Sequence, residues 1–467
     1  MSLKIDINKI VKEITKNFEK RFLNKKGFIS RTYPISNRSI IDNFVDIIPF
    51  LEYFNEKEII FTQLDLLENS SYEKELSVGG IIYSYKIDEY LGGLNHIYKK
   101  LNSEKAKYLL ENAIYKTKNY FINNNNIYDT YDLKKQKRSN FYSSWSSGLL
   151  ETFLEIDTDK FKRNENIRLV EPILKNWVND NFYKKHNIFP FRSSTIKRYY
   201  LIEEINNKFK RYCLEYPSRI TERKNLFKKL LFDNEIIFKL KTFSNRFLNS
   251  GHWSQLMKSN TTPIFTMIEL YRLTNNEYWE REISSWIDSA VDKFTDSKFT
   301  PFSFWDTSNK KRTPSLVAGF ILVDVLCDSF MFVKKEQKWI DIALKISQQC
   351  LSWSWANDLI PMGPDIKYNH IDNQVDFSIS IRKLSEIIGN NKLRNHSFKI
   401  MEAVLNLHKS EDGFYTHIYE NGKNKFIGEN NIDPKYNGLL LKGLIHLQEK
   451  NKNIYDNEKL IDLFKDR

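Results

Sequence analysis

The sequence is dominated by pairs of amphipathic helical runs, each pair joined by a short link. In one pair, apolar residues recur at helical spacing from Phe377 to Ile388, and a turn follows at residues 389–391. A second amphipathic run then extends from Lys392 to Leu407. About seven such pairs recur at intervals of roughly 40 to 60 residues, a spacing typical of repeat arrays. A chain built in this way has to pack helix against helix, so we predict an all-α fold.

The links fall into two classes. Links inside the pairs are short, whereas links between pairs are long and rich in aromatic residues and turn residues, with an Asn-Gly hairpin signal at 421–422. Hairpins stacked side by side bring all the long links to one end, together with the start of every first helix. We therefore predict an (α/α)6-type toroid of about six or seven hairpins, with short β-hairpins in the long loops at one end. An open α-solenoid is the alternative, but such arrays keep regular repeats of roughly 34 to 47 residues.

Two segments depart from the repeated plan. Residues 1–38 are predicted to form an N-terminal helix and an extended arm, which leaves residues 39–467 for the toroid. A basic insert at about 195–250 interrupts the spacing between the third and fourth hairpins. Its basic residues alternate with aromatic ones, so nucleic-acid binding stays open there as the weaker alternative to a solvated helical pair.

Charge and cysteine content narrow the functional classes. The net charge of +13 fits either a solvated basic surface or an anionic partner. The three cysteines form no CxxC motif or Cys/His cluster, so we expect no disulfide framework, no metal site and no cofactor. No apolar run approaches the roughly 18 residues of a membrane span. We expect a cytoplasmic protein, and the oligomeric state is left open.

The starts of the predicted first helices are unusually polar and acidic. Helix capping accounts for any one of these residues, because acids and amides suit helix N-termini. In a closed toroid, however, these starts converge on one funnel, and carboxylates four apart share a helix face. Paired carboxylates can serve as acid and base, or as acid and nucleophile, around a glycosidic bond. The predicted catalytic residues are Asp372, Asp376, Asp46, Asp88 and Tyr436.

A second set of polar and aromatic residues is predicted to bind the substrate. Aromatic faces stack on sugar rings, and carboxylates accept hydrogen bonds from hydroxyl groups. If the substrate is a uronic acid, a cation must neutralise its carboxylate while Tyr, His or Lys moves the proton. Converging helix N-termini also favour an anionic sugar. The predicted substrate-binding residues are Asp42, Tyr90, Trp145, His252, Trp253, His370, Asn373, Tyr415, His417 and Lys435.

The hairpin layout resembles the six-hairpin glycosidase-like superfamily, which includes glycoside hydrolases, polysaccharide lyases and sugar epimerases. Two stretches are similar to the C-terminal domain of glucuronyl C5-epimerases. They are the aromatic-Tyr-Ser segment at 141–148 and the His-Ile-Asp-Asn-Gln segment at 370–374, where Asp372 stands between the His-Ile and Asn-Gln pairs. The resemblance implies a toroid that acts on carbohydrates.

The leading prediction is a carbohydrate-active enzyme acting on an oligo- or polysaccharide. Whether that substrate contains uronic acid, and whether the enzyme is a hydrolase, a lyase or an epimerase, are left open. A non-catalytic α-solenoid scaffold that binds an acidic partner through a basic face is the alternative. A terpene-cyclase or prenyltransferase-like toroid is a third interpretation. A terpene cyclase needs an aspartate-rich DDxxD-type cluster and a prenyltransferase needs zinc ligands, and the sequence shows neither.

Overall fold

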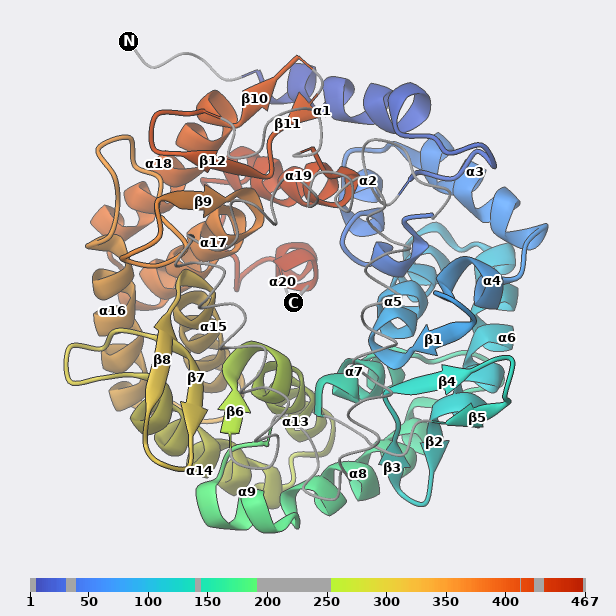
Figure 1. The fold of residues 1–467 in the computed structure, drawn as a ribbon, viewed down its shortest axis with the longest axis horizontal. Helices are drawn as coiled ribbons and strands as arrows, with labels where there is room; N and C mark the ends of the chain where they lie inside the picture. The colour runs from blue at the N-terminus through green and yellow to red at the C-terminus, as the bar shows by residue number, and fades with distance from the viewer. Residues whose placement is uncertain are drawn as a thin grey trace, which may run out of the picture.

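The computed structural model describes residues 6–30, 39–138, 144–190, 253–411, 413–423 and 432–464. These residues form a ring of helices around a central opening (Figure 1). The basic insert predicted at about 195–250 lies outside the described residues. None of the described helices is long and apolar enough to cross a bilayer.

Seven helices form the inner layer of the ring. Each contacts the next one in the list that follows, and the last also contacts the first, so the ring closes. The predicted toroid is therefore confirmed, and the open α-solenoid is wrong. The inner helices are α2 (Ile48–Tyr53), α5 (Ser84–Leu101), α7 (Gly148–Glu155), α13 (Thr262–Thr274), α15 (Leu316–Phe332), α17 (Ile371–Ile388) and α19 (Pro434–Gln448).

A second layer of helices surrounds the first. Buried apolar side chains fill the space between the layers. For example, α17 and α18 contact each other, and Phe377, Ile381, Ile400 and Val404 are buried. The N-terminal helix α1 packs against α19 and so joins this layer. The outer helices are α1 (Ile7–Lys16), α3 (Lys57–Glu68), α6 (Glu104–Phe121), α8 (Arg163–Val178), α14 (Glu277–Phe294), α16 (Gln337–Leu351) and α18 (Asn391–Leu407).

Shorter helical elements join the two layers or follow them. They are η1 (Asn17–Arg21), η2 (Ile41–Asn43), α4 (Tyr72–Leu76), η3 (Ser144–Ser147), α9 (Asn181–His186), η4 (Leu256–Thr261) and α20 (Glu458–Phe464).

Three of the links inside the hairpins, α5–α6, α13–α14 and α17–α18, have the same two-residue geometry. The first residue of the link ends the inner helix in the left-handed region, as Asn102 (φ 49°) and Gly389 (φ 65°) do. The next residue caps the outer helix: Ser103 accepts a hydrogen bond from the amide of Ala106, and Asn390 from that of Leu393. Asn and Gly tolerate the left-handed region, and Ser and Asn are favoured N-caps, so two residues suffice to reverse the chain.

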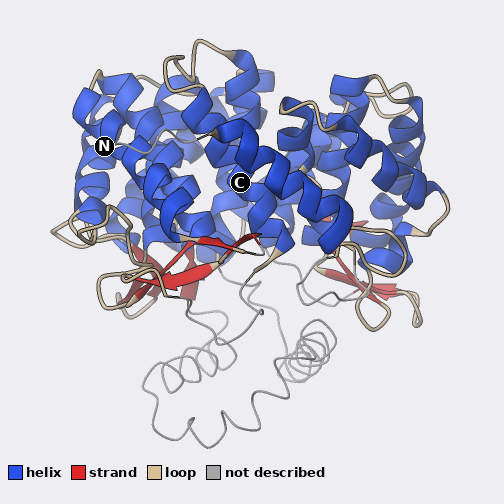
Figure 2. Cartoon of the chain, turned by 90° about the horizontal axis from the view of Figure 1, so that it is seen from above, coloured by secondary structure: helices blue, strands red, loops and turns tan. Residues whose placement is uncertain are grey.

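The long links carry small antiparallel sheets at one end of the ring (Figure 2). The predicted strand around Phe414–Ile418 divides into two, and its second part pairs with the strand before α17. Residues 424–431, on the far side of the predicted Asn-Gly turn, lie outside the described residues. The sheets are β1 (Ile81–Tyr83) with β4 (Thr130–Asp132) and β5 (Lys137–Arg138); β2 (Ile122–Asn123) with β3 (Asn126–Ile127); β6 (Trp253–Gln255) with β7 (Phe302–Asp306) and β8 (Lys311–Pro314); β9 (Tyr368–His370) with β12 (His417–Tyr419); and β10 (Lys409–Ser410) with β11 (Gly413–Phe414).

The first hairpin begins differently from the prediction. Its inner helix α2 starts only at Ile48, with Pro49 in its first turn, and the residues before it form the separate 3-10 turn η2. Proline suits a first helical turn because its missing amide donor is not needed there. Asp42 and Asp46 therefore do not share one helix face, and the prediction that they do is wrong.

Candidate functional site

Acidic side chains from three parts of the ring meet at its strand-bearing end, where the inner helices begin. Asp46 lies between η2 and α2, Asp88 lies on the second turn of α5, and Asp372 and Asp376 lie on the first turns of α17. Lys435, at the start of α19, adds a cation. Because consecutive inner helices contact one another, their N-terminal ends converge on one opening.

Asp46 occupies the centre of this group. Its carboxylate forms an ion pair with Lys435, with 2.6 Å between Nζ and Oδ2. The side chain of Asp46 is only 13% exposed and that of Lys435 only 23%. The negative charge of Asp46 contributes to raising the pKa of Asp88, of Asp372 and of Asp376. One carboxylate thus lies within electrostatic reach of all three other predicted catalytic acids.

The two acids of α17 are four residues apart and share a helix face. Burial, followed by the charge of Asp376, raises the pKa of Asp372 to about 8. Burial also raises the pKa of Asp376, but the ammonium group of Lys442, 3.3 Å from its Oδ1, acts in the opposite direction. A carboxyl group that holds its proton at neutral pH therefore lies beside one that faces a cation.

The carboxyl group of Asp88 is hydrogen-bonded and closely packed. The amide of Glu89 donates a hydrogen bond of 2.7 Å to its Oδ1. Burial and the charge of Glu89 raise the pKa of Asp88 well above its usual value. A Cβ atom built on Gly148 would lie only 2.1 Å from Oδ2 of Asp88. The glycine at the start of α7 therefore leaves the space that the carboxyl group of Asp88 occupies.

Replacing Gly148 by alanine is expected to displace the Asp88 carboxyl group and to lower activity by about tenfold or more. Alanine favours helix by about 1 kcal/mol over glycine, so a loss of activity would not reflect a weaker helix. Steady-state rates and melting temperatures of the variant would test this. Gly92→Ala is the matched control on α5, since its added Cβ meets only the Val45 side chain, at 3.3 Å. Unchanged activity in Gly148→Ala would contradict the claim that activity depends on the position of the Asp88 carboxyl group.

Two histidines and a tyrosine form a second group at the same end. The pairing of β9 with β12 sets His370 opposite His417, and their rings meet edge to face with centroids 4.4 Å apart. The ring of Tyr436 contacts His370 in the same way at 4.6 Å. His370 also caps α17, because its Nδ1 accepts a hydrogen bond from the amide of Asp372. Three predicted residues from different elements thus come together.

Other predicted site residues take structural positions. Asp42 forms an ion pair with Lys86, with 2.7 Å between Oδ2 and Nζ, and each side chain is 1% exposed. Tyr90 is buried and stacks on Tyr72, and Asn373 is also buried. We therefore leave Asp42, Tyr90 and Asn373 out of the proposed site.

The structure gives less detail on the remaining predicted residues. Tyr415 is half-buried and packs against the core. The backbones of Trp145, in η3, and Trp253, in β6, are described, but their side chains lie outside the described set, as does the whole of His252.

Sequence reasoning missed several charged residues of the ring. Lys442 interrupts the apolar run of α19, Lys383 that of α17, and Asp324 that of α15. They are linked: Lys383 lies 3.3 Å from Asp324, whose charge also raises the pKa of Asp376. Charged residues among the apolar residues of these helices were the available signal, because such a charge needs a partner when it is buried.

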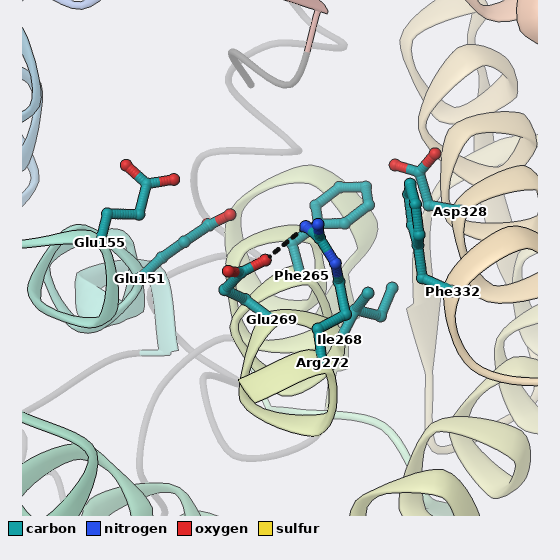
Figure 3. Close-up of a pocket in the computed structure, with 8 residues that line it drawn as sticks. All are labelled: Glu151, Glu155, Phe265, Ile268, Glu269, Arg272, Asp328 and Phe332. Carbon is teal, nitrogen blue, oxygen red and sulfur yellow. Dashed lines mark hydrogen bonds and ion pairs between the residues drawn. The ribbon is translucent and has the colours of Figure 1, made fainter. Parts of the chain in front are cut away.

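A small pocket lies further along the inner helices, toward their C-terminal ends (Figure 3). Three consecutive inner helices line it. Its lining combines carboxyl groups, one guanidinium and apolar rings, and Arg272 donates a hydrogen bond of 2.7 Å to Glu269. The lining residues are Glu151 and Glu155 of α7; Phe265, Ile268, Glu269 and Arg272 of α13; and Asp328 and Phe332 of α15.

No group of three or more His, Cys, Asp or Glu side chains that could hold a metal ion occurs within the described ranges. The two buried cysteines, Cys327 and Cys350, lie in α15 and α16, and burial raises the pKa of both thiols.

The closed double ring, with its strands at one end, defines the six-hairpin glycosidase-like toroid fold, which is the fold of this chain. No protein-family model matches the sequence, and no curated protein matches it. The fold assignment therefore rests on solved structures.

Three solved structures illustrate the likeness. A cellobiose 2-epimerase from Bacillus thermoamylovorans has a TM-score of 0.57 at 10% identity, over 94% of this chain and 99% of that one. A D-mannose isomerase has a TM-score of 0.56 at 8% identity, over 96% and 98%. A GH76 α-mannanase from Bacteroides thetaiotaomicron has a TM-score of 0.55 at 10% identity, over 97% and 98%. At these identities the likeness shows the fold alone.

Proposed function

We propose that this chain is a carbohydrate-active enzyme that performs acid–base chemistry on an oligosaccharide or polysaccharide at the strand-bearing end of the ring. One observation carries the proposal: the Asp372 carboxyl group, with a pKa of about 8, lies within electrostatic reach of Asp46, which is ion-paired to Lys435. A protonated carboxyl group near an ion-paired carboxylate is an arrangement that suits an acid and a base partner. The neighbours of this fold that are named as sugar enzymes agree with the proposal.

Cleavage of a glycosidic bond is the reaction that this arrangement favours. Asp372 would donate its proton to the leaving oxygen, because it still holds that proton at neutral pH. Asp46, from another part of the ring, or Asp376, one helical turn further along α17, would activate water or attack the sugar. Asp88 would hold a sugar hydroxyl group in place.

Epimerisation or isomerisation is the second candidate. His370 and His417 meet edge to face beside Tyr436, and such a group can remove a proton from a carbon next to a carbonyl and return it. Two of the structural neighbours are named as a 2-epimerase and an isomerase. The same proton removal beside a uronate carboxylate would begin a lyase reaction.

The charges near the site favour a neutral sugar over a uronic acid. Among the residues that the structure describes, Lys435 and Lys442 are cations beside these acids, and each already faces a carboxylate, Asp46 and Asp376 respectively. A uronate would have to compete with these carboxylates for the same ammonium groups.

Thermal-shift measurements against neutral and uronic-acid oligosaccharides test the proposal. We expect a neutral oligosaccharide to raise the melting temperature of the wild-type chain. Asp376→Asn should weaken the shift, whereas Asp372→Asn should bind sugar without turning it over. If no saccharide gives a shift, while heparin or nucleic acid binds tightly, the enzyme proposal fails.

The pH dependence gives a separate prediction. Asp372 must be protonated to act as the acid, so kcat/KM should fall about tenfold per pH unit above about pH 8. The positive charge of Lys442 favours the ionised form of Asp372 and lowers its pKa. Lys442→Met should therefore move the alkaline limb of the profile to higher pH. A limb that stays in place or moves to lower pH would argue against Asp372 as the acid.

A further inference from the structure

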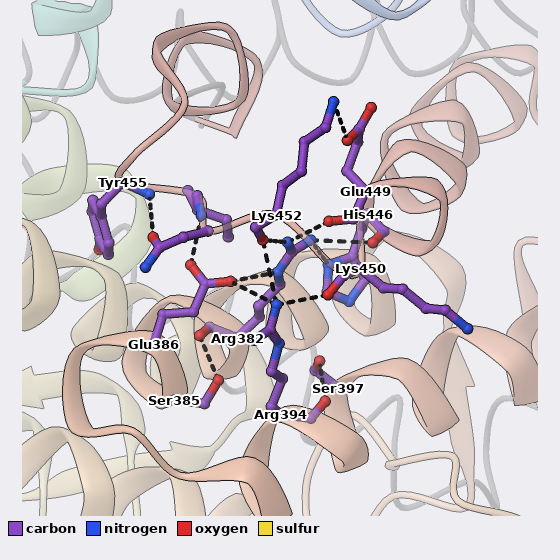
Figure 4. Close-up of polar contacts among 12 residues, drawn as sticks. Arg382, Ser385, Glu386, Arg394, Ser397, His446, Glu449, Lys450, Lys452 and Tyr455 are labelled. Carbon is purple, nitrogen blue, oxygen red and sulfur yellow. Dashed lines mark hydrogen bonds and ion pairs between the residues drawn. The ribbon is translucent and has the colours of Figure 1, made fainter.

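Helix α17 carries two adjacent buried cations, Arg382 and Lys383, which face different parts of the ring. The guanidinium group of Arg382 donates hydrogen bonds to backbone carbonyl oxygens in residues 446–452, at the end of α19 and just after it (Figure 4). It also pairs with Glu386 at 2.8 Å. These contacts hold the backbone that follows α19, so the role of Arg382 is structural.

Lys383 faces α15 instead. Its ammonium nitrogen lies 3.3 Å from Oδ1 of Asp324 and 3.9 Å from Oδ1 of Asp328, and its side chain is only 5% exposed. Ser380, one turn earlier on α17, donates a hydrogen bond of 2.8 Å to Oδ2 of Asp324. The hydroxyl group of Tyr455, in the chain after α19, lies 3.5 Å from Asp328. Two side chains of α17 thus fix one carboxylate of α15 in place.

The fixed carboxylate of Asp324 lies beside the proposed site. Asp372, Asp376 and Lys383 recur at helical spacing, so their side chains lie along one face of α17. The Ser380 hydroxyl group that contacts Asp324 also lies 2.9 Å from the backbone oxygen of Asp376. Burial raises the pKa of Asp376, and the negative charge of Asp324 raises it further. A residue of α15 therefore acts on an acid of α17.

Asp376 is better placed than Asp46 to work with Asp372. Lys435 holds Asp46 at 2.6 Å, and the side chain of Asp46 is only 13% exposed. Lys442 lies 3.3 Å from Asp376, and the side chain of Asp376 is 23% exposed. Asp376 is thus held less closely by its cation and is more accessible to a substrate.

We infer that Asp376 is the carboxylate that works with Asp372, and that Asp324 is its positioning residue. Lys383 and Ser380 hold Asp324 in place. The inference rests on the proposed function and deepens it, because it chooses between the two carboxylates named there. Asp324 acts only through Asp376: an anion beside a carboxyl group disfavours a second negative charge, so Asp376 ionises at higher pH than it would alone.

Groups from several parts of the ring act on Asp376 together with its burial. Lys442 of α19 lowers the pKa of Asp376, whereas Asp324 of α15 and Asp46, which precedes α2, raise it. On its own helix Asp376 faces Asp372, whose pKa the charge of Asp376 raises in turn. Removing any one of these charges therefore has a defined sign.

The acidic limb of the kcat/KM profile tests the inference, because Asp376 must be ionised to act as base or nucleophile. Asp324→Asn removes an anion next to Asp376, so the limb should move to lower pH. The rate at the optimum should change by less than about tenfold, whereas a general base contributes about 10²- to 10⁴-fold. Asp324→Glu keeps the charge and should leave the limb near its wild-type position.

Asp328→Asn is the matched control. It makes the same change one turn further along α15, at the other carboxylate that faces Lys383. Either variant leaves Lys383 with one carboxylate, so both should fold, which their melting temperatures would show. Asp328→Asn should move the acidic limb less than Asp324→Asn does.

A second measurement compares the two carboxylates directly. Asp376→Asn should lower kcat/KM by about 10²- to 10⁴-fold, and Asp46→Asn by less. A larger loss in Asp46→Asn would overturn the inference and leave the proposed function standing. An acidic limb that stays in place or moves to higher pH in Asp324→Asn, or that moves equally in Asp328→Asn, would do the same. If the wild-type chain converts no saccharide, the proposed function fails and the inference fails with it.

Discussion

Replacing Asp372 by asparagine is expected to lower kcat/KM by about 10²- to 10⁴-fold, the usual contribution of a general acid. Asparagine has nearly the same shape but carries no acidic proton. Because the Asp372 carboxyl group is partly buried and its pKa is raised to about 8, the wild-type group is protonated at neutral pH and can donate. Steady-state kinetics on the saccharide that gives the largest thermal shift would measure the loss. The melting temperature should stay the same or rise, because a carboxyl group that burial disfavours has been removed.

Asp365→Asn is the control for this experiment. Asp365 is exposed in the loop before β9, close in sequence to the site, and its replacement should leave the rate within about twofold. If Asp372→Asn keeps more than a tenth of the wild-type rate, Asp372 is not the acid. The His370–His417 pair would then become the leading candidate, and His417→Gln the variant to compare.

Replacing Arg382 by leucine is expected to lower the free energy of unfolding by about 3–5 kcal/mol, the usual result of breaking a buried ion pair. The change removes the nearer of the two cations that face the buried Glu386, leaving only Arg394 at 3.9 Å, and it removes donors from three backbone carbonyl groups. It also releases the chain that follows α19. Urea unfolding followed by circular dichroism would measure the loss.

Arg394→Leu is the matched control for this prediction. Arg394 donates a hydrogen bond of 2.6 Å to the carbonyl oxygen of Lys450, but its side chain is 28% exposed and its loss should change stability by about 1 kcal/mol or less. Equal losses in the two variants would show that Arg382 does not hold the chain after α19 more firmly than a half-exposed arginine does.

Much of the fold was predictable from local chemistry. The period of the apolar residues indicated the helices, and the Asn-Ser and Gly-Asn links marked the turns, because a left-handed residue followed by an N-cap reverses a chain in two residues. The difference between short and long links indicated which end carries the strands. The late start of α2 at Ile48 was harder to predict from the sequence, since Pro49 fits either a kinked helix or a new helix start.

The site was predictable in position but not residue by residue. Helix starts carry acids for two reasons, capping and function, and only the fold separates them. Asp42 faces Lys86 in a buried pair, whereas Asp46 faces Lys435 at the opening, although the two acids are only four residues apart. Which partner each acid meets depends on helices that lie far away in the sequence. The buried position of Tyr90 has the same cause, because Tyr72 of α4 covers it.

A crystal structure of Asp372→Asn soaked with the oligosaccharide of largest thermal shift tests the central claim most directly. The account predicts a sugar at the strand-bearing end, within hydrogen-bonding distance of Asp46 or Asp376. A sugar bound only on the outer helices, with the ring opening empty, would contradict the claim that this ring holds the site of reaction.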